Sequence, residues 1–259
     1  MRIGIPRESK PGERRLALDA AGAAALAADG HEVRVAAGAG EGIGIADADF
    51  AAAGAAIVPP DDAWDAELVV KVKEIQDGEW VRLRAGSTLF SFQHFVGEPA
   101  LAREVAARGV TAIAYEMVRG ADGGFPLLAP MSVIAGRLAI QAGAHHLTLP
   151  GGGNGTLLAA APGSPPARVL VLGGGHAGVN AAEAAAALGA KVTVLTRSAA
   201  TREAVAARLG PAVEAGPPPP PAPPPPPPAP PPPPGGGAAP PPSGTPPAPP
   251  VPPPPPPTR

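Results

Sequence analysis

Short apolar segments alternate with longer amphipathic or alanine-rich segments along the first 130 residues of the chain. A short apolar segment is typical of a buried strand, and the longer segments have the spacing of helices. Strands that alternate with helices predict parallel strands joined by right-handed crossovers, and therefore a doubly wound α/β sheet. The expected strands are residues 1–5, 31–36, 68–72, 87–93 and 110–116, and the expected helices are residues 19–28, 47–54 and 99–109.

Capping residues delimit the first two of these helices. Asp19 and Asp47 stand at their starts, where a side-chain oxygen can accept a hydrogen bond from the first turn. Gly30 and Gly54 follow the same two segments, and glycine commonly ends a helix in the left-handed conformation. The sequence therefore predicts Asp19 and Asp47 as N-caps.

A second pattern begins at about residue 131. Residues 132–147 predict one long helix with Ser132 as its N-cap. Residues 167–198 have the order strand, glycine turn, helix, strand, and residues 199–209 predict a short helix. We expect a substrate domain over residues 1–130, a partial Rossmann domain over 131–210 and a disordered proline-rich tail over 211–259.

The segment GGGHAG at residues 173–178 matches the pattern G-x-G-x-x-G between an apolar strand and an alanine-rich helix. In this pattern Gly173 allows a tight turn, Gly175 lets the backbone approach a pyrophosphate, and Gly178 lets the helix pack on the strand. The N–H groups and the dipole of the helix N-terminus attract the anion. The segment predicts a nicotinamide-dinucleotide site, with a glycine turn kept only for packing as the alternative.

The end of the next strand bears on the choice of cofactor. An acidic residue normally stands there and binds the ribose 2′-hydroxyl. Here Thr196, Arg197 and Ser198 follow the strand, and a guanidinium flanked by hydroxyls suits a 2′-phosphate better. We predict NAD as the cofactor with NADP as an alternative, unless Arg197 is only a solvated surface residue.

Three basic side chains stand near the carboxyl ends of predicted strands, where an open α/β sheet binds its ligands. They are Arg15, Lys73 and His94. An arginine can hold a carboxylate, a lysine can polarise a carbonyl, and a histidine can move a proton near neutral pH. Taken singly, each is more often a surface or structural residue than a functional one, but together at one sheet edge they predict a pocket for a small anionic carbonyl compound.

Composition excludes several classes of function. The formal net charge of -2 gives no sign of binding to nucleic acid or a membrane surface, and no apolar run approaches the roughly 20 residues of a membrane span. The chain has no cysteine, which excludes disulfides and thiolate metal sites and fits a reducing cytoplasm. Because aromatic residues are only 3% of the chain, its small-residue core is expected to depend on oligomer contacts as well.

Residues 217–257 are almost entirely proline, with some glycine and alanine. Proline has no backbone N–H, so such a segment favours extended polyproline II over a packed core. A reading-frame fault in GC-rich coding sequence is the favoured explanation. A proline-rich tail for domains with aromatic grooves and a linker without partners are the alternatives.

Six segments resemble, in order, the signatures of the alanine dehydrogenases: MRIGIPRESKPGERRLAL, HEVRVAAGAGEGIGIADADFAAAGA, LVVKVKE, IAYEMV, PLLAPMSVIAGRLA and VLVLGGGHAGVNAA. The resemblance covers about residues 1–210 and extends to the superfamily shared with the transhydrogenases. It implies reversible oxidative deamination of L-alanine to pyruvate and ammonium, with hydride transfer to a nicotinamide cofactor. It also implies a homohexamer.

The resemblance implies a role for each candidate residue. Arg15 would bind the substrate carboxylate, Lys73 would bind the substrate and polarise its carbonyl, and His94 would transfer a proton. Met131 and Ser132 would lie beside the cofactor, with Ser132 near its phosphates, and His176 and Ala177 would contact the pyrophosphate through the turn. Thr196 stands where the family usually has aspartate.

Two departures from the family pattern bear on function. The segment SFQHFV around His94 is more polar before the histidine and bulkier after it than is usual. The family continues with the rest of the dinucleotide domain and a catalytic aspartate, so we expect a truncated chain, with a half domain of two strands and no turnover. The alternatives are a transhydrogenase alpha-subunit-like protein, which His94 with AYEMV and PLLAPMS disfavours, and a non-enzymatic product with a polyproline arm.

Overall fold

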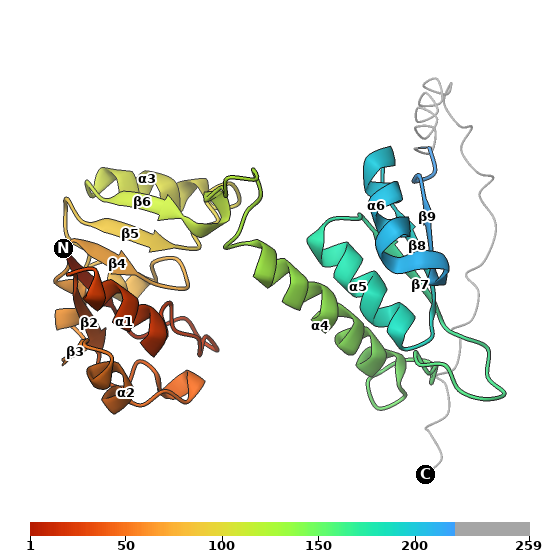
Figure 1. The fold of residues 1–259 in the computed structure, drawn as a ribbon, viewed down its shortest axis with the longest axis horizontal. Coiled ribbons are helices and arrows are strands. Elements are labelled where there is room, and N and C mark those ends of the chain that lie inside the picture. Colours follow the sequence, from red (N-terminus) through yellow and green to blue (C-terminus); the bar gives the residue numbers. More distant parts are fainter. Residues whose placement is uncertain (221–259) are drawn as a thin grey trace, which may run out of the picture. The chain divides into compact units, whose positions relative to one another are not determined.

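The computed structural model describes residues 1–220 of the 259-residue chain. Most of the segment predicted to be a disordered proline-rich tail therefore lies outside the described residues. The described part contains two parallel sheets, one formed before residue 115 and one after residue 167 (Figure 1).

The first sheet has the order β3-β2-β1-β4-β5-β6, and all of its strand pairs are parallel. This is the order of a doubly wound sheet, so the predicted fold class is confirmed. Its strands are β1 (Arg2–Ile5), β2 (Glu32–Ala36), β3 (Ala56–Val58), β4 (Leu68–Val70), β5 (Thr88–Ser91) and β6 (Thr111–Ala114). The short strand β3 has no counterpart in the sequence prediction.

The strand order reverses between β1 and β4, which lie side by side in the centre of the first sheet. In open α/β sheets the crevice outside the carboxyl ends of such strands is where ligands bind. The strands are held side by side because their apolar side chains are buried in the core, as Ile5, Val35, Val69 and Leu89 illustrate. The loops that follow β1, β4 and β5 are therefore placed at one edge by the burial of the strands before them.

The helices of this part are α1 (Ala20–Ala28), α2 (Asp47–Ala52) and α3 (Pro99–Ala107). Asp19 caps α1 as predicted, because its Oδ1 accepts a hydrogen bond from the amide of Gly22 at 2.7 Å. The prediction that Asp47 caps α2 is wrong: Asp47 lies inside the helix, and its carboxylate accepts from the amide of Gly38 at 2.9 Å. The carboxylate of Asp47 therefore binds an amide of the loop before α2 and not an amide of the first turn of α2.

The later elements are α4 (Ala129–Leu147), β7 (Arg168–Leu172), α5 (His176–Ala187), β8 (Lys191–Leu195), α6 (Ala199–Leu209) and β9 (Val213–Gly216). The helix α4 begins before Ser132, whose amide already donates to the carbonyl of Leu128, so Ser132 is not its N-cap. Pro130 in the first turn explains the earlier start, because its fixed φ suits a helix and no N–H is needed there.

The second sheet has three parallel strands in the order β7-β8-β9, where the sequence predicted two (Figure 1). The strand β9 pairs with β8 from Val213 to Gly216, inside the segment that was assigned to the tail from residue 211 onwards. That assignment is wrong over these residues. Among residues 1–220, no helix is both long and apolar enough to cross a membrane.

Candidate functional site

The glycine turn between β7 and α5 has the geometry that its pattern predicts. Gly173 has a φ of 100°, a conformation that side chains rarely adopt. A Cβ on Gly178 would lie 1.9 Å from the carbonyl oxygen of Gly173, so glycine is required where the helix meets the strand. A Cβ on Gly175 would meet no atom within 4 Å, so the backbone there faces open space. The turn therefore fits a pyrophosphate at the N-terminus of α5.

A pocket of about 950 Å³ lies against this turn. Four of the predicted cofactor residues line it, from two strand ends: Gly173, Gly175, Thr196 and Arg197. The first two follow β7, and the other two follow β8, its neighbour in the sheet. The structure thus brings the glycine turn and the loop after β8 to one cavity of dinucleotide size.

Sequence reasoning missed Arg202, which stabilises the loop after β8. Its Nη1 donates to the carbonyl oxygens of Thr196 and Arg197, both at 2.9 Å. The side chain of Arg197 is exposed and makes no hydrogen bond or ion pair within residues 1–220. The backbone of Arg197 is fixed and its guanidinium donors are free, so the side chain is well placed to donate to a phosphate.

The remaining predicted cofactor residues lie in the first turns of two helices. His176 and Ala177 begin α5, and the carbonyl of His176 accepts from the side-chain amide of Asn180 at 2.8 Å. Met131 and Ser132 lie in the first turn of α4, and both are half-buried. These positions agree with a place beside the cofactor, but their roles stay predictions.

Arg15 lies in the loop after β1, and a carboxylate already holds its guanidinium. Its Nε and Nη2 donate to Glu13 at 2.9 and 2.6 Å, while Nη1 lies 2.9 Å from the sulfur of Met131. The hydrogen bonds from Arg15, with smaller contributions from its charge and that of Lys73, lower the pKa of Glu13 to about 2. The guanidinium of Arg15 is therefore paired with Glu13, and a substrate carboxylate would share Arg15 with Glu13 or displace Glu13 from it.

Of the two lysines in KVKE, the structure gives only Lys73 a free ammonium. Lys71 is fully buried and pairs with Glu8 at 3.2 Å and with Glu79 at 2.8 Å. Lys73 is half-buried, and its side chain has no hydrogen bond or ion pair within the described part of the chain. Lys71 is therefore a structural residue, whereas the ammonium of Lys73 is available to a ligand.

Glu8 connects these lysines to the loop after β1. Its carboxylate accepts from the amides of Val72 and Lys73 at 2.6 and 3.3 Å. Burial raises the pKa of Glu8, while the charge of Lys71 opposes that rise. The sequence predicted neither Glu8 nor Glu13, and the only local signal for them is their place beside Arg15 in a polar loop after a strand.

His94 follows β5, the neighbour of β4, and its imidazole is exposed. The ring stacks on Phe92 with 6.3 Å between the ring centroids and 15° between the planes. The polar residue before it, Gln93, is fully buried and donates from Nε2 to the hydroxyl of Ser91 at 2.9 Å. Within residues 1–220 no hydrogen bond or ion pair joins His94 to Arg15 or Lys73, so only the common sheet edge relates them.

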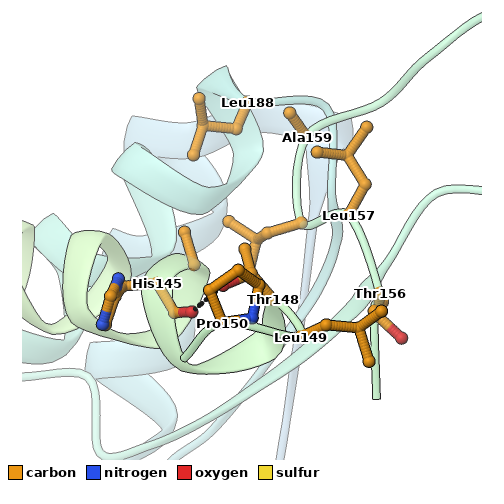
Figure 2. Close-up of a pocket in the computed structure, with 11 residues that line it drawn as sticks. His145, Thr148, Leu149, Pro150, Thr156, Leu157, Ala159 and Leu188 are labelled. Carbon is orange, nitrogen blue, oxygen red and sulfur yellow. Dashed lines mark hydrogen bonds between the residues drawn. The ribbon is translucent and has the colours of Figure 1, made fainter. Parts of the chain in front are cut away.

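A second pocket, of about 610 Å³, lies at the C-terminal end of α4 (Figure 2). Its lining is mainly apolar, with Leu149, Pro150, Leu157 and Leu188 around the side chain of Thr148. None of the predicted site residues lines it. The chemistry that the sequence predicts thus lies at the sheet edges and not in this apolar pocket.

The fold and these sites define a two-sheet α/β protein, with a basic cluster at a switch point and a Rossmann-type glycine turn. Two family models match the chain: "Alanine dehydrogenase/PNT, N-terminal domain" over residues 4–135 and "Alanine dehydrogenase/PNT, C-terminal domain" over residues 139–216. The chain belongs to the alanine dehydrogenase/PNT family, as the resemblance implied.

Individual relatives agree with the family models. The chain is 50% identical to an alanine dehydrogenase of Halomonas elongata, over 76% of this chain and 54% of the relative. It is 53% identical to one of Mycobacterium tuberculosis, over 75% of this chain and 53% of the relative. The chain therefore spans about half the length of the curated relatives that it matches.

Solved structures give the same result. An L-alanine dehydrogenase superposes with a TM-score of 0.77 at 40% identity, covering 83% of this chain and 60% of that one. A transhydrogenase from Sinorhizobium meliloti superposes with a TM-score of 0.70 at 28% identity, covering 83% of this chain and 61% of that one. Both similarities support the family, and the identities favour the alanine dehydrogenase branch.

Proposed function

We propose that this chain carries the substrate site and the first half of the cofactor site of an L-alanine dehydrogenase. The observation that carries the proposal is the placement of Arg15 and Lys73 in the segments after β1 and β4, the two adjacent strands at the switch point of the first sheet. The family and its alanine dehydrogenase relatives supply the reaction. That reaction is reversible oxidative deamination of L-alanine to pyruvate and ammonium.

Each of the three basic residues has one role in this proposal. Arg15 binds the carboxylate of alanine or pyruvate, which replaces Glu13 as the acceptor of some of the guanidinium hydrogen bonds. Lys73 binds the substrate and polarises its carbonyl with an ammonium that has no protein partner in the described residues. His94 moves the proton, because imidazole is the side chain that most often serves as a general acid or base.

The nicotinamide cofactor, when bound, accepts or donates the hydride. In our proposal the substrate domain spans residues 1–130, and the partial Rossmann domain begins at residue 131 and includes β9, which ends at Gly216. The residues that would hold the cofactor are Met131, Ser132, Gly173, Gly175, His176, Ala177, Gly178, Thr196 and Arg197. The glycine turn and the pocket beside it are the observations that support this set.

The direct test is to measure binding of NADH by the full 259-residue chain, followed by its fluorescence, and binding of pyruvate to the NADH-loaded chain. Binding is the readout because no turnover is expected of this chain. We expect Lys73→Met to weaken pyruvate binding by roughly 10-fold or more and to leave NADH binding unchanged, because the lost charge-assisted contact faces only the substrate.

The control for that test is Arg103→Ala, which removes an exposed charge from α3 and should change neither affinity. Failure of the unmodified chain to bind pyruvate would contradict the proposal. Hydride transfer between NADPH and an NAD analogue without alanine would favour the second candidate, a transhydrogenase-like dinucleotide-binding protein. That candidate rests on the superposition with the Sinorhizobium meliloti transhydrogenase.

Arg197 makes the choice between NAD and NADP testable. If its guanidinium binds a 2′-phosphate, Arg197→Ala should weaken NADPH binding by roughly 10-fold to 100-fold and leave NADH binding nearly unchanged. Titrations of both cofactors by fluorescence measure this, with Arg208→Ala on α6 as a control outside the pocket. A strong preference of the unmodified chain for NADH would contradict an NADP role.

Composition and exposed apolar side chains bear on the cellular context. We infer a cytoplasmic protein with small-molecule ligands, without nucleic-acid or membrane partners, from its net charge of -2 and its lack of cysteine. We also infer a homo-oligomer, because exposed apolar side chains such as Leu138, Leu149 and Leu172 need cover.

A further inference from the structure

The backbone of His94 has an unusual conformation. Its φ is 53°, and it is the only non-glycine residue with a positive φ among the described residues. A side chain in this left-handed region crowds the backbone, and the conformation persists only where the surroundings hold it. His94 comes three residues after the end of β5, so the chain turns sharply shortly after it leaves the sheet.

A carboxylate from the segment that follows the neighbouring strand β6 holds this turn. Glu116 accepts from the amide of His94 through Oε1 at 2.6 Å and from the amide of Gln93 at 3.2 and 3.3 Å. Two successive backbone N–H groups that point at one anion form a concave anion-binding nest. Here the anion is a side chain of the protein itself.

The sheet places Glu116 within reach of these amides. Glu116 lies in the short 3-10 helix Tyr115–Met117, directly after β6, and β6 is the neighbour of β5. The last paired residues of the two strands are Ser91 and Ala114, so both segments leave the sheet at the same level. The position of the carboxylate therefore follows from strand register.

The other contacts of His94 also hold its backbone and leave its ring free. Its carbonyl accepts from the amides of Gly97 and Glu98 at 2.9 and 3.0 Å, which closes the turn. Within residues 1–220 the imidazole nitrogens have no hydrogen-bond partner, and the ring only stacks on Phe92. The main chain is thus fixed on both sides, while both ring nitrogens remain free for a ligand.

We propose that Glu116 is a positioning residue for His94. Its carboxylate holds the left-handed turn, and the turn directs the imidazole outward at the carboxyl end of β5. Without the carboxylate the turn relaxes to a negative φ, which moves Cβ and the ring away from this position. The inference rests on the proposed function for the role of His94 in proton transfer, but not for the geometry of the turn.

A double-mutant cycle tests the coupling between Glu116 and the backbone at residue 94. Glu116→Met, His94→Gly and the double variant are made in the full chain, and the melting temperature of each is measured. Methionine has no oxygen that can accept from the amides, and glycine adopts a positive φ at little cost. We therefore expect Glu116→Met to lower Tm in the unmodified background and to lower it by less than half as much in the His94→Gly background. Equal losses in both backgrounds would overturn the proposal.

NMR gives a readout that a merely structural carboxylate would not change. In the unmodified chain the amide proton of His94 should be shifted downfield and protected from exchange, and its backbone shifts should report a positive φ. All three signatures should be lost in Glu116→Met, which has no acceptor oxygen, or in Glu116→Asp, whose carboxylate is one methylene shorter, if the methionine variant does not fold. They should persist in Glu98→Met, a control whose side chain caps no helix amide. Their persistence in both Glu116 variants would refute the role.

Binding of pyruvate to the NADH-loaded chain separates this inference from the proposed function. Glu116→Met should weaken pyruvate binding by roughly 3-fold to 10-fold and leave NADH binding unchanged, because an imidazole that has moved away cannot donate to the substrate. If His94→Ala keeps full affinity for pyruvate, the proposed place of His94 in the substrate site fails, although the cycle and the NMR signatures can still hold. If His94→Ala weakens pyruvate binding while Glu116→Met does not, the positioning role fails alone.

Discussion

Replacement of Gly136 by alanine is expected to disrupt the packing of α4 on α5 and to lower the free energy of unfolding by about 1–3 kcal/mol or more. A Cβ at this position would lie 2.2 Å from the carbonyl oxygen of Ala177 and 3.0 Å from the amide nitrogen of Ala181. Both atoms belong to the backbone of α5, so no side chain can rotate away. The two helices would have to separate.

The same helix offers a matched control. Gly143 also lies in α4, but a Cβ there would meet no atom within 4 Å. Gly143→Ala should therefore raise stability by about 0.5–1 kcal/mol, because glycine is a poor residue inside a helix. Urea unfolding of the two variants and the unmodified chain gives the comparison, and equal stability of Gly136→Ala and the unmodified chain would contradict the packing of α4 on α5.

The site of this substitution also matters for the cofactor. Ala177 belongs to the first turn of α5, directly after the glycine turn. A shift of α5 would displace the amides that are expected to bind the pyrophosphate. NADH binding should therefore weaken in Gly136→Ala and be unchanged in Gly143→Ala.

The fold could be predicted wherever the sequence pattern reflects burial directly. Alternation of apolar and helical segments gave the doubly wound first sheet, and the flanked glycine pattern gave the turn between β7 and α5. The strands β3 and β9 were missed for a physical reason. Each is short and flanked by proline or glycine, and only pairing with β2 or β8 makes it a strand.

The candidate site could be predicted only in part. Arg15, Lys73 and His94 are basic residues at strand ends, so their types and positions drew attention to them. Glu8 and Glu116 could not be found in this way, because their carboxylates act on backbone amides of other segments, at Val72 and His94. Such contacts depend on strand order and register, which local sequence does not specify.

Lys71→Met is expected to be among the most destabilising substitutions in the described part of the chain, at a cost of about 3–5 kcal/mol. Lys71 is fully buried, and its ammonium is the partner of Glu8 and Glu79, whose side chains are 2% and 4% exposed. Removal of the ammonium leaves two carboxylates close together and without a counter-charge in a buried place. Methionine keeps most of the volume, so the loss reports charge and not a cavity.

Lys73→Met is the matched control, because Lys73 is half-buried and has no ion pair in the described residues. It should change stability by less than about 1 kcal/mol while it weakens pyruvate binding. Urea unfolding of both variants separates the structural lysine from the proposed functional one. Similar losses in the free energy of unfolding of the two variants would contradict the assignment of a structural role to Lys71 and a functional role to Lys73.

The pH dependence of the Lys71→Met variant provides a further check on the buried charges. Burial already raises the pKa of Glu8, and the charge of Lys71 opposes this rise, so the substitution should raise that pKa further. A carboxyl whose pKa is higher in the folded state binds more protons there than in the unfolded state. Stability is then lost as pH rises from the ordinary carboxyl pKa of about 4.5 through the raised value. The variant should therefore recover stability relative to the unmodified chain as pH falls towards 4.5, and Lys71→Met combined with Glu8→Gln should show a smaller recovery because residue 8 no longer takes up a proton.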